Sequence, residues 1–260
     1  MAKKEIDTSH LNAQQFRELV QVQKDVFYFS TFAYVVHPVR GKTRFLLYPY
    51  QKSVLYCFLK HRFNIILKFR QAGITELISL YCLWLTMYHP NKKVNIISIK
   101  DSVAKKVLKK IKYMYKNLPE HLKVPVVNGR MGELGTASMI EFINGSFIES
   151  IPTSEEAGRS ESLSLLVIDE AAIVRWASTI WAAAAPGLKR LQILILLFTL
   201  FDYIGKCTPS EIRNGTIQCP KLWAQEELPK KLMVTSFLPV VLYLTLQILR
   251  QSRTLYQSIQ

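Results

Sequence analysis

Residues 65–76 read IILKFRQAGITE, and residues 165–170 read LLVIDE. The first stretch begins with apolar, β-prone residues, turns at a glycine and continues into apolar positions at helical spacing, which predicts a strand, a turn and a helix. The second stretch is a continuous apolar run that ends in two carboxylates, as a buried parallel strand does. This alternation favours an α/β fold with a mostly parallel sheet between helices.

The turn after the first strand predicts a phosphate-binding loop. Free backbone N–H groups gather there at the positive end of the following helix. Gly73 has no Cβ, so a phosphate can approach the backbone closely, and the Thr75 hydroxyl stands where a magnesium ligand is needed. We therefore expect the nucleotide to be bound by Gln71, Ala72, Gly73, Ile74 and Thr75.

The cation of this loop is displaced from its usual place. A phosphate loop ordinarily ends in Gly-Lys-Ser/Thr, but Ile74 stands at the lysine position, whereas Lys68 and Arg70 lie at the front of the loop. Arginine can grip phosphate through two hydrogen bonds. Either these two cations neutralise the phosphate charge, or the segment is a plain strand-turn-helix with exposed cations. The residues do not decide which of the two cations is the principal one.

The carboxylates at the end of the second stretch suit nucleotide hydrolysis. Asp169 would hold magnesium directly or through water, and Glu170 would polarise the attacking water as general base. The simpler alternative is a helix start, where acidic residues are favoured by the helix dipole. Because the pair follows a phosphate loop in the same chain, we predict an ATPase with a P-loop NTPase-like, three-layer fold, its mostly parallel central sheet flanked by helices.

With the cation moved to its front, the loop KFRQAGIT (residues 68–75) resembles that of the ATPase domain of bacteriophage terminase large subunits, the motors that pump DNA into a viral prohead. Residues 47–51, LYPYQ, are similar to the adenine-recognition motif of that family. The resemblance implies that Gln51 pairs with the adenine edge, as amides do in base readout, and that Tyr50 stacks on the ring. Alternatively, Pro49 starts a helix there and the aromatic residues belong to the core.

The resemblance spans residues 40–186 and implies further parts of a motor. Arg159 stands ahead of the acidic strand, and in similar proteins an arginine there is an arginine finger that acts in cis or on a neighbouring subunit. The implied ligands are ATP and Mg²⁺. The implied partners are double-stranded DNA, the portal protein, the small terminase subunit and further copies of the chain in a ring, and the implied location is the host cytoplasm, docked on the prohead.

The pattern fades after residue 186. Members of the family that the chain resembles have a strand here that ends in a Ser/Thr-rich coupling motif, which links hydrolysis to DNA movement. In this chain an apolar run over residues 191–198 precedes Thr199, so the resemblance implies that Thr199 is the coupling residue. Full-length members of the family that the chain resembles continue into a nuclease domain with clustered carboxylates. The acids beyond residue 186 do not form such a cluster; they are Asp202, Glu211, Glu226 and Glu227. We infer a shortened product without the nuclease. One hypothesis is a frameshift near residue 187, which an uninterrupted frame to Gln260 in several isolates would contradict.

The expected organisation has three parts: an N-terminal helical extension over residues 1–40, a P-loop ATPase domain over residues 41–204, and a divergent tail over residues 205–260. The apolar stretch 232–249 approaches the length of a membrane span. Pro239 and several polar residues interrupt it, so a buried helix or a misframed tail is the preferred interpretation and a membrane partner is not expected.

Composition supports a polyanionic partner. The formal net charge is +15 and the pI is about 9.7, which favours long-range attraction to nucleic acid. Lys105, Lys109, Lys112 and Lys116 share one face of a predicted helix. They either contact DNA phosphates or form an ordinary solvated face. The four cysteines have no metal-type spacing and are expected to be free thiols in a reducing cytoplasm.

Two other functions are compatible with the same residues. A helicase-like nucleic-acid translocase shares the adenine glutamine and the Asp-Glu pair, but it usually keeps the loop lysine that Ile74 replaces. A non-catalytic remnant with a damaged nucleotide site would bind DNA or a membrane without hydrolysing ATP. Magnesium-dependent turnover separates the motor from the remnant.

Overall fold

The structure is a computed structural model, and it describes residues 11–61, 63–68, 71–127, 134–154, 157, 163–171, 174–177, 179–180 and 193–199. Two site residues predicted from the sequence, Arg70 and Arg159, lie outside the described residues. The predicted tail over residues 205–260 and its apolar stretch also lie outside them. Among the helices that are described, none is both long and apolar enough to cross a membrane.

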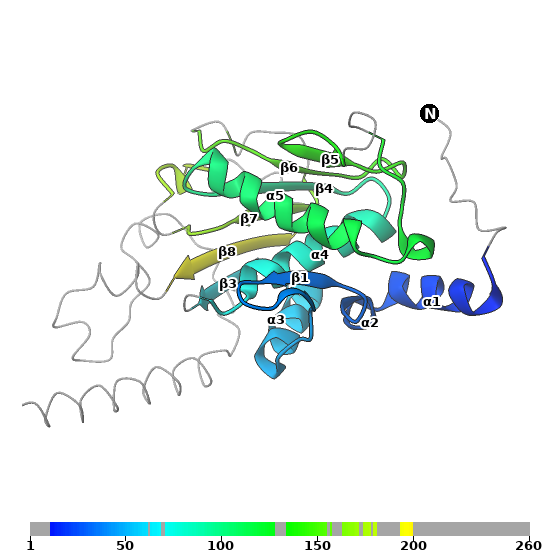
Figure 1. Cartoon of the computed structure of the whole chain (residues 1–260). Coiled ribbons are helices and arrows are strands. Elements are labelled where there is room, and N and C mark those ends of the chain that lie inside the picture. Colours follow the sequence, from blue (N-terminus) through cyan, green and yellow to red (C-terminus); the bar gives the residue numbers. More distant parts are fainter. Residues whose placement is uncertain are drawn as a thin grey trace, which may run out of the picture.

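A six-stranded sheet forms the centre of the molecule (Figure 1). Its strands follow one another in space as β3 (Phe63–Lys68), β8 (Ile193–Thr199), β7 (Leu165–Ile168), β4 (Lys93–Ile97), β6 (Phe147–Ser150) and β5 (Met139–Glu141). Every neighbouring pair is parallel except β5 and β6. Strand β7 is buried along its whole length, which explains its uninterrupted apolar sequence.

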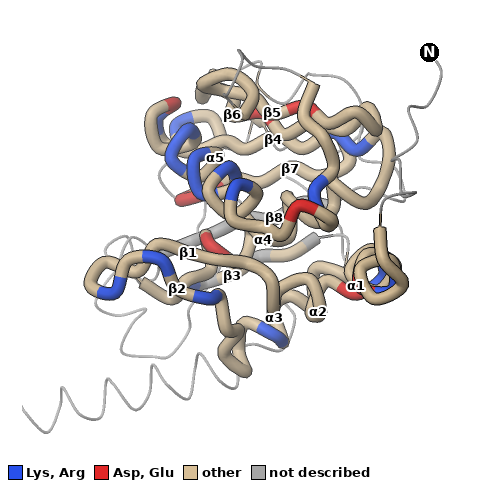
Figure 2. The backbone as a smooth tube through the Cα atoms, turned by 45° about the vertical axis from the view of Figure 1, so that its right-hand side comes forward, with Lys and Arg blue, Asp and Glu red and all other residues tan. Residues whose placement is uncertain are grey.

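Two long helices pack against each other and both contact β4 and β6. Helix α4 (Ile74–Tyr88) is buried at nearly every position, as its almost wholly apolar sequence requires. Helix α5 (Asp101–Lys116) is amphipathic: it buries one apolar face, and its lysines lie on the remaining surface (Figure 2). Helix α3 (Pro49–Lys60) packs against α4. This arrangement confirms the predicted α/β class, with a mostly parallel sheet flanked by helices.

The N-terminal segment belongs to the same core. Helices α1 (Ala13–Lys24) and α2 (Val26–Ser30) bury Val22 and Phe29 in the cluster that also contains α4. The indole N–H of Trp84 in α4 donates to the carbonyl of Val22 at 2.8 Å. Next in sequence, β1 (Tyr34–His37) pairs with β2 (Gly41–Arg44). The predicted boundary after residue 40 therefore falls inside the turn of a hairpin.

A short 3₁₀ helix, η1 (Glu120–Leu122), connects α5 to the β5–β6 hairpin and contacts α1. The contact includes a polar pair, since His121 Nε2 lies 2.8 Å from Glu18 Oε2. These packed elements hold α3 and α4 in place beside the carboxyl end of β3, where the predicted phosphate loop begins.

Candidate nucleotide-binding site

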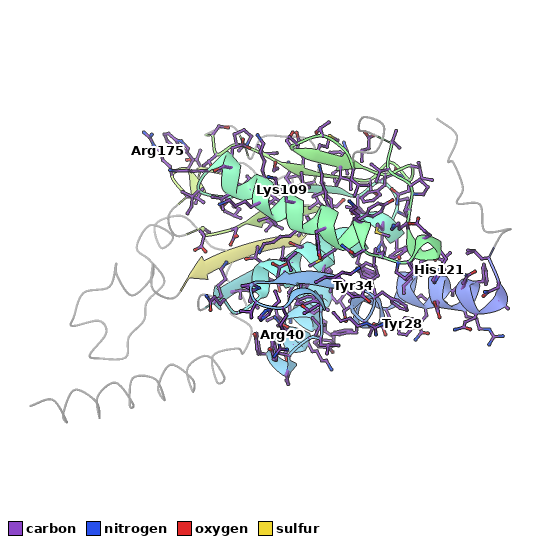
Figure 3. All side chains as sticks on the ribbon, in the orientation of Figure 1. Tyr28, Tyr34, Arg40, Lys109, His121 and Arg175 are labelled. Atoms are coloured by element: carbon purple, nitrogen blue, oxygen red, sulfur yellow. The ribbon has the colours of Figure 1, made fainter. Side chains whose placement is uncertain are left out.

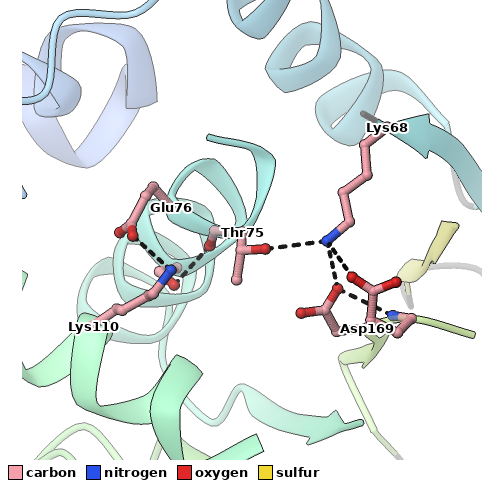
Figure 4. Close-up of polar contacts among 7 residues, drawn as sticks. Lys68, Thr75, Glu76, Lys110 and Asp169 are labelled. Atoms are coloured by element: carbon pink, nitrogen blue, oxygen red, sulfur yellow. Dashed lines mark hydrogen bonds and ion pairs between the residues drawn. The ribbon is translucent and has the colours of Figure 1, made fainter. Parts of the chain in front are cut away.

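Residues from three separate segments meet around one lysine (Figure 4). Lys68 is the last residue of β3, and its Nζ lies 2.8 Å from Asp169 Oδ1 and 3.4 Å from Glu170 Oε1. The same Nζ lies 3.3 Å from the hydroxyl of Thr75, in the first turn of α4. Parallel strands end at one edge of a sheet, and for that reason residues far apart in sequence converge here.

The positive charge of Lys68 is balanced by the carboxylates around it. Its side chain is only 9% exposed, and that of Asp169 is 8% exposed. A buried charge requires partners, and an ammonium has three N–H donors, which face three oxygen acceptors here. The centre of this group, between Thr75 and Asp169, is thus a position that favours a cation.

The oxygen atoms Thr75 Oγ1 and Asp169 Oδ1 are also suitable ligands for a magnesium ion. The Lys68 ammonium is a stand-in cation, within hydrogen-bonding distance of both Thr75 Oγ1 and Asp169 Oδ1. Magnesium is commonly held by one or two protein oxygens, with water and substrate phosphate completing its coordination. Within the described ranges, no group of three or more His, Cys, Asp or Glu side chains forms a separate metal cluster.

The backbone around this site is strained. Gln71 and Glu170 have φ angles of 64° and 56°, in the left-handed region. Of the non-glycine residues that the structure describes, only Asn91 shares this feature. Such conformations cost about 1 kcal/mol or more and persist where the surroundings impose them. At Glu170 the strained backbone turns the chain immediately after the buried strand β7, and its N–H donates to Asp169 Oδ1 at 3.1 Å.

The loop reaches α4 through Gly73, the residue that caps the helix, with a φ of 67°. Glycine adopts this conformation without steric cost. Ile74, at the usual lysine position, is 3% exposed and belongs to the hydrophobic core. Only its backbone is thus available to a phosphate, and among the residues that the structure describes Lys68 is the cation beside the carboxylates.

Helix α3 is hydrogen-bonded to the phosphate loop. The carbonyl of Ala72 accepts hydrogen bonds from the Tyr50 hydroxyl at 2.8 Å and from Gln51 Nε2 at 3.1 Å. Gln51 is 1% exposed, and its Oε1 accepts a hydrogen bond from the backbone N–H of Tyr48. Pairing of this amide with adenine stays a prediction, because both ends of the amide are engaged by the protein here.

The Tyr50 ring lies parallel to the exposed ring of Tyr48, with 5.7 Å between their centroids and 6° between their planes. Partial burial raises the pKa of the Tyr50 hydroxyl, and the neighbouring Tyr48 acts in the same direction. The hydroxyl therefore keeps its proton and remains a donor to Ala72. Stacking of Tyr50 on a nucleobase likewise stays a prediction.

The last predicted site residue, Thr199, lies at the end of β8. Its Cα is the register partner of Lys68 in β3. On the other side of β8, Ile168 of the adjacent β7 pairs with Leu196. The candidate coupling residue is therefore adjacent to the residue that bridges the site. Its side chain is outside what the structure describes.

Of the four lysines predicted to share one face of α5, two have partners within the protein. Lys105 pairs with Asp101 at 2.5 Å, and Lys112 donates to the carbonyl of Thr136. The lysines that are exposed along the helix are Lys106, Lys109 and Lys116. Lys109 is labelled on α5 in Figure 3. Helical periodicity found the face, but only the neighbouring segments show which of its lysines are engaged.

No protein-family model matches this sequence. Among solved structures, the large terminase of bacteriophage HK97 is similar, with a TM-score of 0.53 and 16% identity, over 75% of this chain and 42% of that one. Lower scores are found for the large terminase ATPase domain of Thermus phage P74-26 (TM-score 0.41, 18% identity, 56% of this chain and 63% of that one). They are also found for a thermophilic bacteriophage large terminase in complex with ATP-γ-S (TM-score 0.41, 14% identity, 64% and 48%).

The HK97 match carries the conclusion about the fold, and this chain spans well under half the length of that protein. In the sheet of this protein, the strands that precede the loop and the acidic pair are both neighbours of β8. The chain has the P-loop NTPase-like α/β fold found in the large terminase of a bacteriophage.

Proposed function

We propose that this protein is the ATP-hydrolysing motor domain of a phage DNA-packaging terminase large subunit, which couples hydrolysis to translocation of double-stranded DNA into a prohead. The observation that carries the proposal is the convergence of Lys68, Thr75, Asp169 and Glu170 at the carboxyl edge of the sheet. A cation, a hydroxyl and two carboxylates are the groups that phosphoryl transfer to water requires.

In this proposal, each residue has a separate task. The backbone at Gly73 and the start of α4 bind the phosphates. Thr75 and Asp169 would hold Mg²⁺, which would supply positive charge beside the triphosphate. Lys68 exchanges its carboxylate partners for phosphate oxygens. Glu170, whose side chain is 23% exposed, accepts a proton from water as the water oxygen attacks the γ-phosphorus and ADP leaves.

The remaining assignments complete the motor. Arg70 supplies a second phosphate cation, Arg159 acts as the arginine finger, and Thr199 couples the site to DNA movement. The partners are double-stranded DNA, the portal protein, the small terminase subunit and further copies of the chain in a ring, in the host cytoplasm. The formal net charge of +15 supports an acidic polymer as partner.

The test is magnesium-dependent ATP hydrolysis by the purified protein, with and without double-stranded DNA, beside the Glu170→Gln variant. We expect turnover that DNA stimulates and that the variant lacks. ATP binding without turnover in either protein would contradict an active motor in the isolated chain. Failure to bind ATP at all would favour the non-catalytic remnant.

A further inference from the structure

One peptide group of the phosphate loop is held by two neighbouring residues of another helix. The carbonyl of Ala72 accepts from the Tyr50 hydroxyl at 2.8 Å and from Gln51 Nε2 at 3.1 Å. A carbonyl oxygen has two lone pairs, so these donors use its full capacity. The loop also approaches α3 closely at Gly73, where an added Cβ would lie 2.7 Å from Gln51 Nε2.

The orientation of this carbonyl fixes the direction of an N–H group. No cis peptide bond is present in the described residues, and in a trans peptide the C=O and N–H bonds point in opposite directions. Because the carbonyl of Ala72 points at α3, the N–H of Gly73 points away from α3. In a loop of this type the phosphate-binding donors gather at the N-terminus of the following helix, which is α4 here, and the Gly73 N–H is the one immediately before it.

The two donors are themselves fixed. Gln51 is buried, and its Oε1 accepts from the backbone N–H of Tyr48 at 3.1 Å, so neither end of the amide turns without losing a bond. Tyr50 remains protonated because partial burial raises the pKa of its hydroxyl. Pro49 at the start of α3 restricts the backbone next to both residues.

We propose that Tyr50 and Gln51 are positioning residues for the triphosphate: they hold the Ala72–Gly73 peptide so that its N–H faces the phosphates. This inference rests on the proposed nucleotide site. It assigns both side chains to the phosphate chain of the ligand rather than to its base. It follows that they affect ATP, GTP and a base-free phosphate chain equally.

The test compares three ligands on one set of variants. Tyr50→Phe removes only the hydroxyl, and Gln51→Met removes the amide at similar volume. Tyr56→Phe is the matched control, because it makes the same change at an exposed position of the same helix. Dissociation constants are measured by calorimetry for magnesium tripolyphosphate, ATP and GTP, after circular dichroism has established that each variant is folded.

We expect Tyr50→Phe and Gln51→Met to weaken the binding of all three ligands by one common factor, about threefold to tenfold for the loss of one hydrogen bond. The ATP-to-GTP ratio stays constant, and Tyr56→Phe binds as the unaltered protein does. If Gln51→Met is unfolded, Tyr50→Phe decides.

Two other results would overturn the inference. Weaker ATP binding with unchanged tripolyphosphate binding, or a changed ATP-to-GTP ratio, would show that the two side chains contact the base. If Tyr50→Phe and Gln51→Met bind each ligand as tightly as the unaltered protein does, the loop is positioned without these two side chains. Failure of the unaltered protein to bind any of the three ligands would instead overturn the proposed function and this inference with it.

Discussion

Lys68 and Asp169 are 101 positions apart in sequence, yet Lys68 Nζ lies 2.8 Å from Asp169 Oδ1. Both side chains are almost fully buried. A buried ion pair of this kind contributes little when intact, but removing one partner leaves an uncompensated charge. The pair therefore connects the stability of the sheet edge to the chemistry of the site.

The first prediction concerns this pair. Lys68→Met should destabilise the protein by about 3 kcal/mol, because two acids lose their counter-ion in a poorly solvated position. Adding Asp169→Asn should recover part of the loss, since the double change removes one of these charges. The measurement is a double-mutant cycle by urea denaturation. Additive effects of the two substitutions would contradict the contact.

The second prediction concerns divalent cations in the absence of nucleotide. The ammonium of Lys68 occupies the position between Thr75 Oγ1 and Asp169 Oδ1, so it competes with a metal ion for the same oxygens. Lys68→Met should therefore bind Mn²⁺, read by electron paramagnetic resonance, more tightly than the unaltered protein. Weaker or equal binding would place the cation elsewhere, and Lys109→Met on the exposed face of α5 is the control.

The third prediction separates binding from hydrolysis. Glu170→Gln keeps the shape of the side chain but removes its basicity, so it should lower kcat by at least about 100-fold. The dissociation constant for ATP should change little, because the phosphates are bound by the loop. A large rise in that constant, with kcat preserved, would assign Glu170 to binding. Single-turnover kinetics and calorimetry measure the two quantities.

The fourth prediction concerns Gly73. Gly73→Ala introduces a side chain at a φ of 67° and places its Cβ 2.7 Å from Gln51 Nε2. The conformational part costs about 1 kcal/mol, and the steric part adds to it. Combining Gly73→Ala with Gln51→Ala should relieve the steric part alone. Thermal denaturation of the single and double variants checks this, and full recovery would contradict the conformational contribution.

The fifth prediction is a pH dependence of stability. Burial, and to a lesser extent the charge of Lys92, lowers the pKa of His89. The unfolded chain therefore takes up a proton before the folded protein does, so the contribution of neutral His89 is present above pH 6.5 and is lost as the pH falls. His89→Gln should lose less melting temperature between pH 7.5 and pH 5.5 than the unaltered protein does.

Local sequence signals were sufficient for the framework of the site. The apolar runs before Lys68 and Asp169 gave the strands, and the glycine and threonine that follow the first strand gave the loop and the start of α4. These features depend on residues close together in sequence. Their convergence at one sheet edge follows from the parallel class of sheet.

The contacts that refine the site could not be read from local patterns. The bonds from Tyr50 and Gln51 to Ala72 join residues 22 and 21 positions apart. The burial of Ile74 depends on the packing of α4 within the core, and the contact of α1 with that core includes the hydrogen bond from Trp84 to Val22, 62 positions apart. A motif position assigns a residue type to a task, whereas the direction of its side chain is decided by tertiary packing.

The position of β8 sets the width of the site. Because β8 lies between β3 and β7, the strand that ends in Lys68 and the strand that precedes Asp169 are separated by two inter-strand spacings, about 10 Å in total. These two strands are therefore not hydrogen-bonded to each other. Lys68 crosses that span with its long side chain. Because β8 pairs with both neighbours, the distance that the Lys68 side chain has to span depends on how β8 packs between them.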